Sequence, residues 1–176
     1  MLDKELYHSN IETMYRKLVD GLVLLSANEN DTGPTGMTIA WGFFGNMWNE
    51  PFFIAASRPH RFTLRAIQDS QAFSVNFFDC GYKEALNYFG RVSGYEEKKF
   101  EKGYLHCSNP TEEFAPVDEA VIVLNCRLVT NNQIEPFNLM RSYTEKHYKS
   151  DNGFHAMLYG RVDEMQLRDN FGLNNG

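Results

Sequence analysis

The sequence of 176 residues lacks several features that would assign a function directly. It has three cysteines, Cys80, Cys107 and Cys126, an odd number without a C-x-x-C pair, so neither a disulfide framework nor a structural zinc site is expected. No apolar run approaches the roughly 20 residues of a membrane span, and the first ten residues do not combine a basic region with an apolar one. We therefore expect a cytoplasmic protein with free thiols and no membrane partner.

Positive charge and the common catalytic motifs are also scarce. Lys and Arg number 17 against 23 Asp and Glu, a formal net charge of −6, which argues against nucleic acid or an anionic membrane as the main partner. The glycine-rich phosphate loops G-x-G-x-x-G and P-loop are absent, as are the metal motif H-E-x-x-H and the hydrolase motif G-x-S-x-G. We expect no bound metal, and a hydrolase is unsupported.

What the chain has in excess is aromatic side chains. It contains 14 Phe, 9 Tyr and 2 Trp, and these large planar groups must be buried or must face a planar ligand. The length suits one domain, residues 1–176, with a real hydrophobic core.

Short apolar runs bounded by turn residues predict a mostly β protein with a few short helices. Residues from about 10 to 19 carry apolar side chains at helical spacing, which predicts an N-terminal helix within residues 1–20. In the rest of the chain, short apolar runs bounded by Gly, Asn or Pro predict strands, and apolar residues at helical spacing predict short helices. The expected strands are 22–27, 37–44, 52–56, one starting at Phe73, 121–130 and 154–162; the expected helices are 62–69, 83–89 and 96–102; residues 170–176 are expected to fray.

The order of these elements favours an antiparallel barrel or sandwich. Strands scattered between short helices, without regular βαβ alternation, argue against a doubly wound parallel sheet. In the strand that starts at Phe73, apolar residues alternate with Ser74 and Asn76. This alternation predicts a half-buried strand that presents the two polar side chains on its other face.

Residues 57–63 form a candidate anion site. The segment ends a predicted strand, turns at a proline and starts a predicted helix, so the guanidinium groups of Arg58 and Arg61 and the backbone N–H groups of the helix start can meet a phosphate. A simpler interpretation stays open. In it the arginines are solvated surface charges, and Ser57 or Thr63 only caps the helix.

Trp41, Ser74 and Asn76 each allow two interpretations as well. A tryptophan on a glycine-flanked strand is more often a core residue than a platform for a ligand. Serine and asparagine on the polar face of a strand usually just face solvent. A functional site is favoured by the occurrence of all three together with residues 57–63 in one stretch, residues 35–76.

Five segments taken together resemble the flavin-reductase-like FMN-binding split barrel family, and within it the flavoredoxin-like branch most closely. The resemblance extends over about residues 20 to 162, and the combination is far more specific than any single segment. The segments are Thr35-x-Met-Thr-Ile-x-Trp41, Ser57-Arg-Pro-x-Arg-Phe-Thr63, Phe73-Ser-Val-Asn-Phe77, Ser93-Gly94 followed by Lys99-Phe100, and Gly153-Phe-His155-x-x-x-Tyr-Gly160.

The resemblance implies an antiparallel Greek-key split β-barrel, a homodimer, and one FMN per protomer near the subunit interface. It implies no catalytic side chain, because the flavin carries the chemistry. His155 is similar to a family histidine that approaches the open face of the flavin on the substrate side; a satisfied interface histidine is an equally good interpretation. The implied cofactor-binding residues are Met37, Thr38 and Trp41 against the ring, Ser57, Arg58, Arg61 and Thr63 around the phosphate and ribityl chain, Lys99 at the phosphate, Ser74 and Asn76 along the ring or ribityl side, and Thr35 at the start of the first motif.

Two positions depart from the family pattern. Thr35 stands where the family usually has Asn, and Tyr95 stands where it usually has Arg, so one amide and one cation are missing. The resemblance implies an NAD(P)H-linked oxidoreductase that passes electrons from nicotinamide to flavin and on to an acceptor. Two alternatives stay open: a non-enzymatic FMN electron carrier that docks to a redox partner, and a barrel that has lost flavin and serves as an interaction module.

Overall fold

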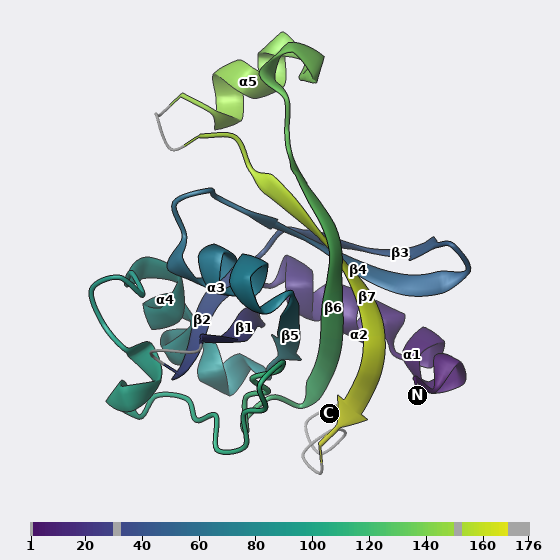
Figure 1. Cartoon of the computed structure of the whole chain (residues 1–176), viewed down its shortest axis with the longest axis vertical. Helices are drawn as coiled ribbons and strands as arrows, with labels where there is room; N and C mark the ends of the chain where they lie inside the picture. The colour runs from purple at the N-terminus through teal and green to yellow at the C-terminus, as the bar shows by residue number, and fades with distance from the viewer. Residues whose placement is uncertain (1, 30–32, 150–152, 169–176) are drawn as a thin grey trace.

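The computed structural model of the chain describes residues 2–29, 33–149 and 153–168. Within these residues, seven strands form one antiparallel sheet in the order β2-β1-β5-β6-β7-β4-β3 (Figure 1). The sheet is not closed, since β2 and β3 lie at its two ends, as expected for a split barrel. The strands are β1 (Val23–Glu29), β2 (Gly33–Ile39), β3 (Gly42–Met47), β4 (Glu50–Ser57), β5 (Ala72–Phe77), β6 (Ile122–Gln133) and β7 (Ala156–Leu167).

The strands expected from the sequence are confirmed, with one difference. The single run 37–44 is two strands, because the chain leaves β2 after Ile39 and enters β3 at Gly42. This break sets Trp41 between two strands. The expected fraying of residues 170–176 lies outside the described residues.

Short helices flank the sheet. Those expected at 10–19, 62–69 and 83–89 are confirmed, and a further one, α1, precedes them, capped by the Asp3 carboxylate, which accepts the N–H groups of Glu5 and Leu6. Among the described residues, no helix has the length and apolar character that a membrane span requires. The helices are α1 (Lys4–Ser9), α2 (Ile11–Val19), α3 (Phe62–Ser70), α4 (Lys83–Arg91) and α5 (Arg141–His147), with 3-10 turns η1 (Cys80–Tyr82), η2 (Lys99–Lys102) and η3 (Pro136–Asn138).

The helix expected at 96–102 is wrong, because only the 3-10 turn η2 forms there. The Lys99 amine donates to the carbonyl oxygens of Phe89 and Val92 at the end of α4. These tertiary contacts draw the segment back onto α4, and they outweigh the local preference for a helix.

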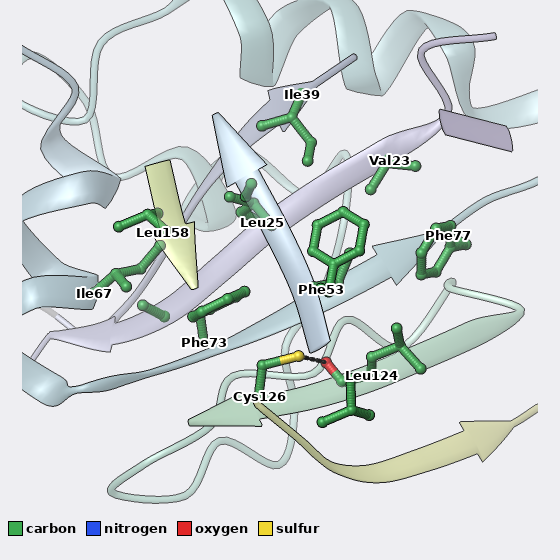
Figure 2. Close-up of a cluster of buried hydrophobic side chains, with 14 of the residues drawn as sticks. Val23, Leu25, Ile39, Phe53, Ile67, Phe73, Phe77, Leu124, Cys126 and Leu158 are labelled. Atoms are coloured by element: carbon green, nitrogen blue, oxygen red, sulfur yellow. Dashed lines mark hydrogen bonds between the residues drawn. The ribbon is translucent and has the colours of Figure 1, made fainter. Parts of the chain in front are cut away.

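The principal core lies on the inner face of the sheet. Phe53, Phe73 and Phe77 are fully buried there, with Cys126 among them (Figure 2). Gly160 makes this packing possible, since a Cβ at that position would lie 2.4 Å from the Cζ atom of Phe73. The buried, reduced Cys126 is therefore a packing residue.

A second core covers the opposite face of β1, β5 and β6. It contains Leu24, Val123, Phe89 of α4, and Val117 of the long segment 103–121. Because this segment and α4 cover the face, all six residues of β5 are buried. The half-buried strand expected from the alternation around Phe73 is thus wrong.

The far ends of β6 and β7 extend beyond the rest of the sheet and carry α5. Figure 1 shows the two strands running out together to this helix, which stands apart from the other elements. We call residues 129–149 the arm. Its side chains are largely exposed, apart from a few that turn back toward β4 and β7.

Candidate functional site

A cavity of about 250 Å³ lies where the ends of β2 and β4 approach each other across the opening of the sheet. The two ends touch: the Ser57 hydroxyl donates to the Met37 sulfur at 3.6 Å. The cavity therefore collects residues that lie about 20 positions apart in the sequence. Its lining is Met37, Thr38, Ile39, Ala40, Trp41, Ala56, Ser57, Arg58, Arg61 and His155.

A second cavity, of about 260 Å³, lies on the other side of the α3 start. It is lined by Thr35, Phe62, Tyr95 and Lys99, among others. Thr35 lies 3.4 Å from Thr63, hydroxyl oxygen to hydroxyl oxygen. We call the two the ring cavity and the lysine cavity.

Lys99 and Arg61 are two neighbouring cations of this region, where the exposed Lys98 also lines the lysine cavity and Arg58 the ring cavity. Lys99 is only 4% exposed, and its amine donates to two carbonyl oxygens, at 2.9 Å and 3.2 Å. Burial, and then the nearby Arg61 guanidinium, lower the pKa of Lys99 to about 8. Arg61 donates to the Gly90 carbonyl at 3.2 Å. Since no salt bridge joins either residue to a carboxylate within the described part of the chain, their charge is available to an anion.

The start of α3 adds backbone donors beside these cations. Arg61 is the N-cap residue, and no side chain caps the helix. The first N–H groups of a helix lack intrahelical acceptors and carry the positive end of the helix dipole. The helix start thus reinforces the positive character created by Arg61 and Lys99.

Arg58 has a different place. Its guanidinium donates to the carbonyl oxygens of His147 and Gly153 and lies 4.9 Å from the centre of the Tyr148 ring. It lines the ring cavity, but two of its five N–H donors hold the arm and the start of the last strand together. Arg58 is therefore at least partly a structural residue.

His155 forms the wall of the ring cavity nearest the arm. Its ring is 4.6 Å from that of Trp41, and its Nδ1 atom is 2.9 Å from the Tyr148 hydroxyl. Burial, and then Arg58, lower the pKa of His155 to about 4. The imidazole is accordingly neutral near pH 7.

Trp41 is half exposed, unlike the core tryptophan that was the commoner interpretation of its sequence context. Its position in the break between β2 and β3 frees its ring from the sheet, and its carbonyl accepts the Ala56 N–H group at 3.2 Å. A planar ligand can stack on such a ring.

Ser74 and Asn76 do not join either cavity. Both are fully buried, and their polar atoms are occupied: Ser74 donates to Asn125, while the Asn76 amide donates to the Leu24 carbonyl and to Ser26. The Asn76 side-chain oxygen accepts the Val117 N–H group. Asn76 thus ties the covering segment to the sheet, while Ser74 links the neighbouring strands β5 and β6.

Of the eleven residues expected at the cofactor, Met37, Thr38, Trp41, Ser57, Arg58 and Arg61 line the ring cavity, Thr35 and Lys99 line the lysine cavity, and Thr63 lies against Thr35. The sequence reasoning missed Phe62, whose ring needs Gly94 beside it because a Cβ there would lie 2.7 Å from Phe62 Cδ1. The contact between these two residues, 32 positions apart, is formed by the fold and leaves no local signal in the sequence. Groups of His, Cys, Asp and Glu that could hold a metal do not occur in the described residues.

Comparisons with known proteins agree with this architecture. A flavoredoxin from Methanosarcina acetivorans superimposes with a TM-score of 0.66 at 21% identity, over 84% of this chain and 68% of that one. A flavoredoxin of Desulfovibrio vulgaris (Miyazaki F) gives 0.64 at 22% identity, over 84% and 69%. An FMN-binding protein from Thermus thermophilus, solved with bound p-hydroxybenzaldehyde, gives 0.65 at 18% identity, over 85% and 73%.

No curated protein sequence gave a significant match. The family profile described as flavin reductase like domain, in contrast, matches residues 14–175, nearly the whole chain. This match and the structural neighbours support FMN as the cofactor expected from the sequence. On the evidence of its motifs, its open antiparallel sheet and this profile, the chain belongs to the flavin reductase like domain family.

Proposed function

We propose that this chain is an FMN-binding flavoprotein whose own residues hold the cofactor across the ring and lysine cavities. The observation that carries the proposal is a buried lysine and a neighbouring arginine, Lys99 and Arg61, without carboxylate partners in the described chain, beside a cavity walled by a half-exposed tryptophan. A phosphate offsets such charge, and a planar ring system suits such a wall.

The residues of the two cavities fit both the phosphate and the ring system of FMN. Lys99, Arg61 and the uncapped start of α3 would hold the phosphate. Met37, Thr38 and Trp41 would hold the ring system. Tyr95, which replaces the usual family arginine, packs edge-on against Phe62 at 4.9 Å. Lys99 would then be the buried cation that this segment supplies.

The activity that fits best is an NAD(P)H-linked oxidoreductase. Bound FMN would supply the hydride and electron transfer between a nicotinamide and an acceptor. The chain binds and orients the cofactor through the groups named above. Neutral His155 walls the ring cavity without adding a charge, and Arg58 keeps the wall in place through its contacts with the arm.

A visible absorption spectrum of the purified protein, followed by titration with FMN, tests cofactor binding. We expect flavin absorbance as purified, or saturable binding of added FMN. Absence of both would refute the proposal and would favour the third interpretation, a flavin-free interaction module.

An FMN electron carrier is the alternative, and the flavoredoxins among the structural neighbours favour it. Stopped-flow mixing of the FMN-loaded protein with NADH or NADPH separates the two. Rapid bleaching of the flavin supports the oxidoreductase. Reduction by dithionite alone supports the carrier.

A homodimer is part of the same proposal. The arm exposes Phe137 and Met140, which are 81% and 68% accessible, and exposed apolar side chains of this size commonly mark interfaces. Light scattering coupled to gel filtration should give twice the chain mass of 20.3 kDa. A stable monomer would contradict this part of the proposal.

A further inference from the structure

A third cavity, of about 430 Å³, lies between the arm and the ring cavity. It shares Trp41, Ala56 and His155 with the ring cavity, so these residues form a common wall of the two. Cavities of this size hold small organic ligands. We call it the arm cavity.

The lining of the arm cavity is almost entirely rings and aliphatic groups. Phe43 of β3, Tyr143 of α5 and Tyr148 contribute aromatic faces from three segments. Phe43 and Tyr143 are 58% and 56% exposed, although both line a concave site. Aromatic side chains left open around a cavity provide stacking surfaces for a ring.

Charge is missing from this lining. Among the described residues, no Lys, Arg, Asp or Glu side chain contributes to the wall. His155 is neutral near pH 7, since burial and Arg58 depress its pKa. An ionic ligand would lose its hydration here without gaining a partner, which disfavours it.

The polar side-chain groups of this lining are those of Trp41, Tyr143, His147, Tyr148 and His155. The Nδ1 atom of His155 is paired with the Tyr148 hydroxyl, while within the described chain no group pairs with the other ring nitrogen, Nε2. A neutral imidazole nitrogen can bind a hydroxyl or a carbonyl group. His155 thus offers a hydrogen bond to a ligand that lies among aromatic surfaces.

We propose that the arm cavity binds an uncharged compound of one or two aromatic rings that carries a hydroxyl or carbonyl group, held between Phe43, Tyr143 and Trp41 and hydrogen-bonded to His155. The shared wall places this compound beside the ring cavity, where it could exchange electrons with the flavin; that last step alone rests on the proposed function. A second copy of the chain inserted into the cavity is the competing occupant.

Calorimetric titration of the purified full chain at pH 7 tests the inference with two matched probes. 2-Naphthol is neutral and has two rings with one hydroxyl, whereas 2-naphthalenesulfonate has the same rings and a negative charge. We expect one site for 2-naphthol, with a dissociation constant at least about tenfold lower than that of the sulfonate. Equal affinities, tighter binding of the sulfonate, or no binding of 2-naphthol would overturn the proposal.

Two tyrosine variants locate the site. Tyr143→Ala should weaken 2-naphthol binding roughly three- to tenfold, the contribution of one aromatic contact. Tyr15→Ala is the matched control, because Tyr15 is also 56% exposed but lies on α2, outside the cavity. Equal effects of the two variants would refute the location.

Two further readouts separate the alternatives. Affinity for 2-naphthol that falls as the protein self-associates would show that a second copy fills the cavity, and this would overturn the inference. FMN titration of the same preparation reports on the proposed function separately. Binding of 2-naphthol without FMN binding would leave the inference standing while the proposed function fails.

Discussion

Lys99 should make FMN binding depend on pH above neutrality. Burial and Arg61 lower its pKa to about 8, whereas an exposed lysine has a pKa of about 10.4. A phosphate against the amine favours the protonated form, so FMN binding takes up a proton wherever the free protein has lost it. Affinity is therefore full below pH 8 and falls as the pH rises above it.

The size of the effect follows from the same shift. If the phosphate restores an ordinary lysine pKa, the dissociation constant for FMN increases about tenfold between pH 7 and pH 9. Lys99→Met removes a charge-assisted hydrogen bond worth about 1.5–3 kcal/mol. The variant should bind FMN roughly 10- to 100-fold more weakly at pH 7, and its affinity should no longer depend on pH in this range.

Flavin fluorescence titrations at pH 7, 8 and 9 provide the assay. Riboflavin, which lacks the phosphate, should bind with the same affinity at all three values and to both proteins. Lys102→Met is the matched variant, since Lys102 is exposed on the same 3-10 turn and does not line the lysine cavity. The reasoning fails if riboflavin shows the same pH dependence as FMN, or if Lys99→Met binds FMN like the unmodified protein.

Three further predictions concern the fold and the cavity walls. Gly160→Ala should lower the free energy of unfolding by about 1–3 kcal/mol, because its Cβ would collide with Phe73; Gly45→Ala, with nothing within 4 Å of its Cβ, should change it far less in the same urea titrations. Asn76→Ala leaves the buried Val117 N–H group without its partner and should lower the free energy of unfolding by about 2–4 kcal/mol. Asn87→Ala, on the exposed side of α4, should leave this free energy nearly unchanged. Equal losses in the two variants would contradict a stabilising role for the hydrogen bonds of Asn76. Folding lowers the pKa of His155 to about 4, against 6.5 in the unfolded chain, so the unfolded chain binds more protons between these two pH values. The free energy of unfolding therefore falls by up to about 3 kcal/mol as the pH drops through that window. When unfolding is measured at pH 7, 5.5 and 4, His155→Gln should lack this part of the acid-induced loss of stability.

Much of the candidate site could be predicted from the sequence because it is encoded in short segments. The ends of β2 and β4 each carry a motif, and only the strand β3 lies between them in the chain. Met37, Trp41, Ser57 and Arg61 therefore come together from one short stretch of sequence. Lys99 was also expected near the phosphate, on the strength of the family resemblance. The structure places Lys99 in a buried position near Arg61, and its role at a phosphate stays a prediction.

The misplaced residues were those whose surroundings come from far along the chain. The alternation around Phe73 describes one strand correctly, but whether Ser74 and Asn76 face solvent depends on segment 103–121, which covers them. The segment 96–102 has a helical pattern, yet the contacts of Lys99 with α4 prevent the helix. The local pattern of apolar and polar residues carries no information about which distant segments will pack against a strand or a helix.

The sequence by itself determined the antiparallel class, the strand positions, the family and the residues at the mouth of the sheet, since these depend on local period and on motifs of a few residues. Only the tertiary structure decided that Arg58 holds the arm, that Ser74 and Asn76 are buried and hydrogen-bonded within the fold, and that the arm cavity exists. The physical reason is that burial and pairing depend on which distant segments pack together. A side chain of given chemistry becomes a ligand or a support according to what the fold places against it.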